Sequence, residues 1–566
     1  MWLERSGEHA VQIFGAGRIK VFLRLFYWLF VAGYAALILA NSDFSPGDDV
    51  IFLRTLQQGV PLLFNSADFP YFDGRVLGRF MPLDSVEYNL LLAFSDAPAV
   101  YLYFLVHAVQ FLVFSLLLVK LLQQVTTNEW VIYLTPIALA LLPGYASVWI
   151  GLQHNERDVA FFFLLFALSY LSYLEQKEWK RFVLVILCAN AAIYFKETAF
   201  IAIGSFAAAH YLLATRTRDD HAGKHLDLAL MASALAYPLL YAAMVLPHAE
   251  FSRMAGTTHD LPSFIKSILN GAAVYDPLIL LFALPITLLR GLQILTGKTT
   301  AEPVYDALLF SSAMFVLSYF ILNRVGSYYF VPAYVLAIPP VIYFLQKYLW
   351  RARPIRILFL VTGVLWLFNT LPAGVHQVTY LKYMPHNFNL MLDTVADHVR
   401  QRGSPGRTNI FLDGISPSDS GWTYFIFAEF LQYRGLRSDQ FDLKSDLPRV
   451  VVDSTPIVRL GRVPTPFSAF GPGQPWAVQK GDLLIVSPHS NDRWRRVDNE
   501  SYIKGLLKEH VLLFHTQSRY AFPMFTLKEL GRYLLSIGAS PGETFLSISR
   551  HRPTPERPDY YVFVRK

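Results

Sequence analysis

The chain has 566 residues, of which 54% are hydrophobic and only 16% are charged. A soluble protein usually carries about a quarter charged residues, so this composition excludes an ordinary soluble enzyme and indicates a membrane protein. The net charge of +7 does not indicate a nucleic-acid partner, because excess Lys and Arg in a membrane protein mark the loops that stay in the cytoplasm. Cys188 is the single cysteine, which excludes a disulfide framework and a Cys-based metal site.

Apolar runs of membrane-spanning length follow one another from near the amino terminus. A transmembrane helix needs about 17–25 predominantly apolar residues. About eleven runs meet this requirement, at residues 20–40, 98–121, 130–149, 158–174, 180–195, 197–214, 227–246, 274–296, 306–323, 328–347 and 355–372. The first run lacks a small-residue cleavage site, so we expect a retained helix. The sequence therefore predicts a polytopic α-helical membrane protein.

The charges in the loops predict the orientation of these spans. Basic residues gather in alternate loops, namely Arg18, Lys20, Arg24, Lys177, Lys180, Arg181, Arg216, Arg218, Lys224, Lys298, Lys347, Arg351, Arg353 and Arg356. Cytoplasmic loops carry this excess of Lys and Arg. We therefore expect a multi-pass protein of the plasma membrane, the inner membrane of a bacterium, with a cytoplasmic amino terminus and an extracytoplasmic carboxyl terminus.

The composition becomes mixed and polar from about residue 376. TNIFLDG, GDLLIVSP and YYVFVRK read as strands, and NLMLDTVADHVRQRG and LKELGRYLLSIGAS read as amphipathic helices. The sequence thus predicts a transmembrane catalytic domain at residues 1–375, with a long first outer loop at 41–97. A soluble extracytoplasmic, periplasmic α/β domain follows at 376–566, and we expect it to help present an acceptor.

The outer loops collect the unusual polar residues. The first contains the adjacent acids Asp48 and Asp49, and QHNERD at 153–158 contains His154, Glu156 and Asp158. Lys196 precedes Glu197 in YFKETAF, and NRVGSYYFVP contains Arg324 and Tyr328. Each has a simpler explanation: Asp48 as a helix cap, QHNERD as a solvated turn, Lys196–Glu197 as an interfacial pair, Arg324 as a partner of a helix dipole, and Tyr328 as part of an aromatic belt. Their convergence on one face is what favours a functional site.

One reaction fits this combination of groups. Transfer of a sugar from a polyprenyl-phosphate donor needs a carboxylate that takes the proton of the acceptor hydroxyl as its oxygen attacks the anomeric carbon. It also needs cations that stabilise the charge growing on the leaving phosphate. A single displacement inverts the anomeric configuration.

Three segments resemble the GT-C class of integral-membrane glycosyltransferases: GDDVIFLRTLQQGVPLLFN after the first span, HNERDVAFF, and NRVGSYYFVPAYVLA, which is similar to an R-Y-x-x-P segment. The DD stretch is similar to that of the arabinofuranosyltransferase-like branch, but FPYFDGRVLGRFMPLD after Asn65 departs from it, so arabinofuranose is one candidate sugar. The resemblance implies a catalytic base at Asp48 or Asp49, and acceptor positioning or a second acidic site at Glu156 and Asp158. It implies donor-phosphate binding by Lys196 and Arg324, helped by His154 and Tyr328. Some members of the class use a divalent cation and others do not, and Asp48, Asp49, Glu156 and Asp158 are its candidate ligands.

The expected partners are a polyprenyl-phosphate sugar, a glycan, lipid or protein acceptor in the cell envelope, and membrane lipids, with no nucleic acid. Two alternatives lack catalysis. A transporter would hold its substrate near the middle of the membrane, and an envelope-assembly scaffold would tolerate substitution of Asp48.

Overall fold

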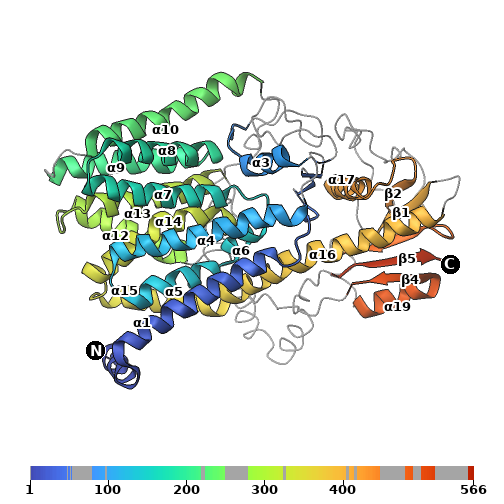
Figure 1. Cartoon of the computed structure of the whole chain (residues 1–566), viewed down its shortest axis with the longest axis horizontal. Helices are drawn as coiled ribbons and strands as arrows, with labels where there is room; N and C mark the ends of the chain where they lie inside the picture. Colours follow the sequence, from blue (N-terminus) through green and yellow to red (C-terminus); the bar gives the residue numbers. More distant parts are fainter. Residues whose placement is uncertain are drawn as a thin grey trace.

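The structure is a computed structural model, shown in Figure 1. It describes residues 2–47, 49–50, 52–53, 56, 79–95, 99–217, 223–248, 265, 278–322, 327–402, 407–413, 417–445, 478–487, 499–516 and 559–566. Asp48 and Arg324 lie outside these ranges. So does the predicted amphipathic helix LKELGRYLLSIGAS.

Most of the described chain is helical. The membrane half contains α1 (Trp2–Leu39), α3 (Val86–Phe94), α4 (Val100–Val125), α5 (Glu129–Ala140), α6 (Pro143–Ile150), α7 (Glu156–Glu175), α8 (Trp179–Phe195), α9 (Ala199–Thr217), α10 (Lys224–Met244), α12 (Leu284–Leu295), α13 (Pro303–Ile321), α14 (Val331–Phe344), α15 (Arg353–Leu365) and α16 (Leu371–Arg402). Shorter turns are η2 (Leu246–His248), η4 (Leu278–Ala283), η5 (Ser327–Phe330), η6 (Leu345–Leu349) and η7 (Trp366–Thr370). The long helices lie side by side along the long axis of the molecule, and α16 leaves the bundle toward the carboxyl-terminal sheet (Figure 1).

Eight helical segments of the described chain are long and apolar enough to cross a membrane. They are Ile19–Leu39, Val100–Val125, Glu156–Glu175, Ala199–Arg216, Lys224–Met244, Leu278–Leu295, Pro303–Ile321 and Tyr328–Leu349, and the bent pair α5–α6 would make nine. The runs predicted at 180–195 and 355–372 coincide with α8, which has 17 residues, and with α15 followed by η7. The total of eleven spans therefore stays a prediction.

The break between α5 and α6 bends the chain by 71°. Pro143 is the first residue of α6, where its missing N–H and fixed φ begin a new helix rather than extend the old one. Every residue of α6 is buried, including Trp149. The bend thus places a short helix inside the bundle, beneath the polar residues described below.

Large apolar side chains cover the outside of the bundle. Phe22 and Leu29 on α1 are each 63% exposed, and Leu116 on α4 is 54% exposed. Exposed apolar area on this scale is unfavourable in water. It matches the hydrocarbon interior of a membrane, in agreement with the predicted membrane location.

The carboxyl-terminal part contains a small mixed sheet. Its strand order is β2-β1-β3-β5-β4, formed by β1 (Thr408–Leu412), β2 (Phe441–Ser445), β3 (Leu483–Val486), β4 (His510–His515) and β5 (Tyr561–Arg565). β1 pairs in parallel with β2 and β3, whereas β5 is antiparallel to β3 and β4. The described helices here are α17 (Pro417–Tyr433) and α19 (Asn499–Glu509). The strands predicted in TNIFLDG, GDLLIVSP and YYVFVRK are confirmed as β1, β3 and β5.

The boundary predicted at residue 375 lies within α16, a continuous helix of 32 residues. The predicted amphipathic helix NLMLDTVADHVRQRG is its second half. One helix therefore joins the bundle to the sheet.

Candidate functional site

Eight ionisable side chains gather where three polar segments meet, near the end of the bundle from which α16 departs. They come from the segment before α3 and α3 itself, from the start of α7, and from the loop between α8 and α9. We call them the ionic cluster: Arg79, Asp84, Glu87, Glu156, Arg157, Asp158, Lys196 and Glu197. Figure 1 shows α3 at this end of the bundle, facing α17 and the sheet.

The loop between α8 and α9 supplies one half of the cluster. α8 ends at Phe195 and α9 begins at Ala199, so only three residues turn the chain. The Nζ atom of Lys196 donates a hydrogen bond of 2.7 Å to Oε1 of Glu156, the first residue of α7. Nε and Nη2 of Arg79 both donate to Oε1 of Glu197, at 3.0 and 2.8 Å. Each cation in this half thus carries a carboxylate partner.

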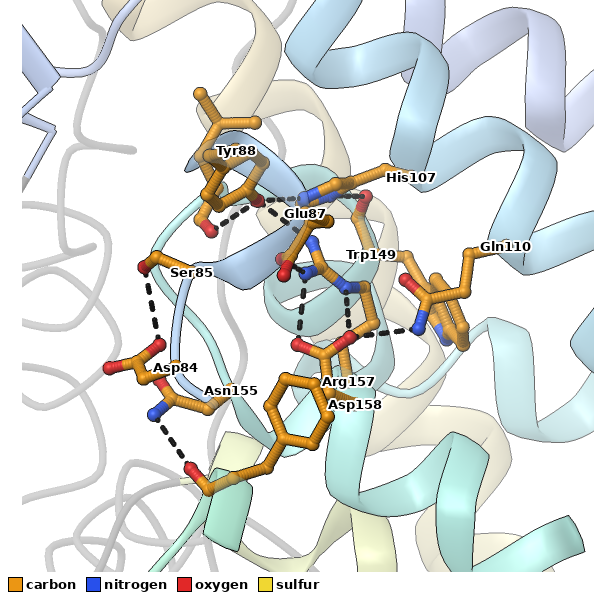
Figure 2. Close-up of polar contacts among 12 residues, drawn as sticks. Asp84, Ser85, Glu87, Tyr88, His107, Gln110, Trp149, Asn155, Arg157 and Asp158 are labelled. Atoms are coloured by element: carbon orange, nitrogen blue, oxygen red, sulfur yellow. Dashed lines mark hydrogen bonds and ion pairs between the residues drawn. The ribbon is translucent and has the colours of Figure 1, made fainter. Parts of the chain in front are cut away.

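Arg157 organises the other half of the cluster (Figure 2). Its guanidinium donates to Tyr88 Oη at 2.9 Å, to Asp158 Oδ2 at 2.9 Å, and to Glu87. Gln110 donates to Asp158 Oδ1 at 2.8 Å. Arg157 is only 1% exposed. Because a buried charge must be paired and hydrogen-bonded, this network fixes α3 against α4 and α7.

Tyr88 and the buried His107 extend this network toward α6 (Figure 2). The hydroxyl of Tyr88 donates to the carbonyl of Leu152 at 2.8 Å and contacts His107 Nε2. Nδ1 of His107 lies 3.1 Å from the carbonyl of Trp149. These bonds attach α3 to the end of α6 and make this half of the cluster a rigid support.

The backbone at the start of α3 directs its acids to different places. Ser85 has φ 61°, a left-handed conformation that non-glycine residues adopt rarely. Its hydroxyl donates to Asp84 Oδ1 at 3.3 Å. Asp84 therefore lies outside the helix and half-buried, whereas Glu87 enters the Arg157 network from within the helix.

The acids of the cluster differ in their affinity for protons. Burial raises the pKa of Asp84 to about 7, although Arg79 and Lys196 oppose the shift. Burial and the neighbouring Asp158 raise the pKa of Glu87 to about 7. Burial alone would raise the pKa of Glu197, but Arg79 and Lys196 together hold it below its ordinary value. The site therefore contains carboxyls that titrate near neutral pH beside one that stays ionised.

The structure brings several of the predicted residues together. Lys196, Glu156 and Asp158 lie in the cluster, and the ring of His154 lies 4.5 Å from that of Tyr328, centroid to centroid. The ammonium of Lys196 lies 5.4 Å from the ring centroid of Tyr329, the residue that follows Tyr328. Gly151 permits this arrangement, because an added Cβ would lie 2.9 Å from the His154 ring.

The first-loop acids are only partly described. Asp49 is 5% exposed, and its Oδ2 accepts a hydrogen bond of 2.8 Å from the backbone N–H of Ser45. Val50 and Leu53 are buried, as expected for the inner side of a short helix. Asp48, the leading candidate for the base, is not among the described residues, so its role stays a prediction.

The sequence predicts no site role for five members of the cluster: Arg79, Asp84, Glu87, Arg157 and Glu197. A signal for them exists, since the first loop carries Arg79, Asp84 and Glu87 within nine residues and Arg157 separates two acids. Without the fold, however, no pattern shows that these two segments meet.

The described residues do not form a metal site, since no three of their His, Cys, Asp or Glu side chains are placed to hold an ion. Two of the four candidate ligands are already engaged. Glu156 is bonded to Lys196, and both oxygens of Asp158 accept hydrogen bonds from Arg157 or Gln110.

No protein-family model and no curated protein matches the sequence. Similar solved structures include the oligosaccharyltransferase of Archaeoglobus fulgidus in the apo form, at 12% identity and a TM-score of 0.39, covering 71% of this chain and 64% of that one. Another is AglB from the same organism with an inhibitory peptide and a dolichol-phosphate, at 12% identity and 0.38, covering 72% and 64%. ArnT from Cupriavidus metallidurans bound to undecaprenyl phosphate has 13% identity and a TM-score of 0.38, covering 86% and 96%.

The chain thus spans 64% of the length of the archaeal oligosaccharyltransferase. At these identities and TM-scores the similarity assigns neither a family nor the role of any residue. The roles proposed below rest on the chemistry and geometry of this chain.

Proposed function

We propose that this chain is an inverting glycosyltransferase of the GT-C type, which moves a sugar from a polyprenyl-phosphate donor to an acceptor hydroxyl at the outer face of the plasma membrane. The observation that carries the proposal is the ionic cluster, which places cations and near-neutral carboxyls together beside helices with lipid-facing apolar surfaces. A donor of this kind needs both environments, because its phosphate is anionic and its chain is hydrocarbon.

Lys196 and Arg79 are the described cations suited to the phosphate. An ammonium has three N–H donors, and Lys196 uses one of them, on Glu156. Nη1 of Arg79 makes no hydrogen bond to the described residues. Arg157, in contrast, is committed to its buried network. Arg324 is proposed as a further phosphate ligand, and His154 and Tyr328 as weaker contacts.

In the proposed reaction the acceptor oxygen attacks the anomeric carbon, and the bond from that carbon to the phosphate oxygen breaks. The leaving group is polyprenyl phosphate, and the hydroxyl proton passes to a carboxylate. Asp48 and Asp49 are the proposed bases. Among the described acids Asp84 is a third candidate, because it is half-buried and no cation of the described residues donates a hydrogen bond to it.

We also propose the number of spans, the domain division, the acceptor and the sugar. Eleven spans are reached if α8 and α15–η7 also cross the membrane. The proposed domains are 1–375 and 376–566, the second one periplasmic. Acceptor positioning falls to Glu156 and Asp158, and the acceptor is a glycan, lipid or protein of the cell envelope. Arabinofuranose is one candidate sugar.

Binding and transfer by the full-length protein in lipid nanodiscs test this function. Lys196→Gln keeps an N–H group that can bond Glu156 but removes the positive charge. The affinity for the polyprenyl-phosphate sugar should therefore fall about tenfold to a hundredfold, the value of a charge-assisted hydrogen bond. Lys347→Ala is the matched control, since Lys347 also bonds a glutamate, Glu302, but does so away from the cluster. Unchanged donor affinity in both Lys196→Gln and Arg324→Ala would remove the phosphate assignment.

The base is tested separately by Asp48→Asn and Asp49→Asn. One of these variants should abolish turnover while leaving donor binding largely intact, since a base acts on the acceptor proton. A transporter or scaffold predicts instead that no labelled sugar reaches any acceptor, even with the wild-type protein.

A further inference from the structure

Glu197 holds a carboxylate oxygen that lacks a hydrogen-bond donor. Its Oε1 accepts both hydrogen bonds from Arg79, whereas Oε2 is buried and accepts none from the described residues. Buried polar atoms of native proteins are nearly always hydrogen-bonded, and each exception needs an explanation. Because neighbouring cations hold the pKa of Glu197 below its ordinary value, this oxygen belongs to an ionised group.

Two of the tyrosine hydroxyls that interact with Glu197 are hydrogen-bonded to other groups. Tyr237 and Tyr319 are close enough to interact electrostatically with Glu197. Tyr237 Oη, however, donates to the carbonyl of Phe80 at 2.6 Å. The hydroxyl of Tyr319 is hydrogen-bonded to Thr198 Oγ1 at 2.8 Å. Neither hydroxyl bonds Oε2, so this oxygen can accept a hydrogen bond from a bound molecule.

Lys196, the residue before Glu197, is a cation with N–H groups that no described residue accepts from. Of the three N–H groups of the Lys196 ammonium, one donates a hydrogen bond to Glu156. Aromatic rings line the same region, since Phe80 packs against Tyr237 with centroids 5.8 Å apart and Tyr194 lies 6.0 Å from Tyr237. An open acceptor, an adjacent cation and an aromatic wall together match a glycosyl phosphate, which carries hydroxyls close to an anion.

We propose that Glu197 is a specificity residue for the donor sugar: its Oε2 accepts a hydrogen bond from a sugar hydroxyl while Lys196 and Arg79 bind the adjoining phosphate. This inference rests on the proposed function and extends it. A buried ionised acceptor discriminates strongly, because a sugar that lacks the matching hydroxyl leaves the carboxylate desolvated and unpaired. The site therefore selects a polyprenyl-phosphate sugar with a free hydroxyl near its phosphate.

A purely structural role makes a different prediction. If Glu197 only orients Arg79, its substitution weakens phosphate binding whether or not the lipid carries a sugar. If it contacts the sugar, the loss appears only with glycosylated donors. The experiment therefore compares the two kinds of lipid.

The test uses the full chain in nanodiscs with farnesyl phosphate and with farnesyl-phosphoryl glucose, mannose and arabinofuranose. We expect Glu197→Gln to reduce affinity for the best sugar donor about tenfold to a hundredfold, and affinity for bare farnesyl phosphate by less than about twofold. Glu302→Gln is the matched control, because Glu302 is an ion-paired glutamate outside the cluster. Equal losses for both lipids, or no loss for either, would overturn the inference.

A second arm compares deoxygenated donors on the wild-type protein and on Glu197→Gln. Monodeoxy derivatives of the best donor should include one that binds about tenfold more weakly or worse, and Glu197→Gln should abolish that difference, as expected for two groups in contact. If no deoxy position affects binding, the inference is wrong while the proposed function stands. If the wild-type protein binds none of the lipids, the proposed function fails and this inference fails with it.

Discussion

Asp84 and Glu197 are carboxyls of one cluster, yet their surroundings change their pKa in opposite directions. Arg79 and Lys196 hold the pKa of Glu197 below its ordinary value, whereas Asp84, which accepts a hydrogen bond from the hydroxyl of Ser85 among the described residues, has a pKa of about 7 because of burial. Carboxyls separated in this way suit different tasks, since a proton acceptor works best with a pKa near the operating pH. Glu197 is better suited to hold a hydroxyl, and Asp84 to accept a proton.

Asp84→Asn tests this division of labour. If Asp84 is the base, the variant should lose about a hundredfold to ten-thousandfold in turnover and still bind donor. A base must be deprotonated to act, so kcat/KM of the wild-type protein should rise as the pH rises through about 7 and then level off. Initial rates between about pH 5.5 and 9 measure both effects.

Ser85→Ala provides a finer control for Asp84. The hydroxyl of Ser85 lowers the pKa of Asp84, so its removal should move the midpoint of the pH profile upward without abolishing turnover. Asp84 is not the base if Asp84→Asn is fully active while Asp48→Asn or Asp49→Asn is inactive. The base would then be Asp48 or Asp49.

At the scale of elements, α16 holds the chain segment that leads to Asp48 and Asp49. Lys382 donates to the carbonyl of Ile38 at 2.5 Å, His386 Nδ1 lies 2.9 Å from Asp43 Oδ2, and Asn389 donates to the carbonyl of Phe44 at 2.9 Å. Burial lowers the pKa of Lys382 to about 7, with Asp43 opposing the shift. The helix that carries the sheet thus also positions the first loop.

Asn389→Ala should therefore lower turnover more than donor affinity. Asn389 joins the Phe44 carbonyl to Arg434, whose Nη2 donates to Asn389 Oδ1 at 2.7 Å. Loss of these bonds removes about 1–3 kcal/mol from the contact that holds the first loop. Thr394→Ala, an exposed change on the same helix, serves as the control. Parallel changes of kcat and donor affinity in Asn389→Ala would show that α16 does not act through this loop.

The predictability of each element follows from the range of its interactions. Uninterrupted apolar runs indicate helices because hydropathy is a local property, so the positions of α1, α4 and α7 follow from the sequence. The pairing of Lys196 with Glu156 does not, since it depends on where the ends of α7 and α8 meet. The boundary predicted at 375 marks a change of composition, yet α16 continues through it because polar residues can extend a helix out of an apolar environment.

At the scale of the whole molecule, the ionic cluster and the carboxyl-terminal sheet lie toward the same end of the bundle. α16 departs from that end, and its bonds to residues 38–44 keep the sheet close to the first loop (Figure 1). The basic loops begin where α7 and α9 end, at Glu175 and Thr217. Since α7 begins with Glu156 in the cluster, the basic loop after it lies at the opposite end of the bundle.

The charge bias then predicts the sidedness of the site. Cytoplasmic loops carry the excess of Lys and Arg, so the loop containing Lys177, Lys180 and Arg181 should face the cytoplasm. Alkaline phosphatase fused after Lys566 should be active, because it folds only outside, whereas a fusion within residues 176–178 should be inactive. Green fluorescent protein at the same two positions should show the reverse pattern. An inactive phosphatase and bright fluorescence at the carboxyl terminus would place the ionic cluster in the cytoplasm, and the donor would then have to be one that is exposed on the inner leaflet.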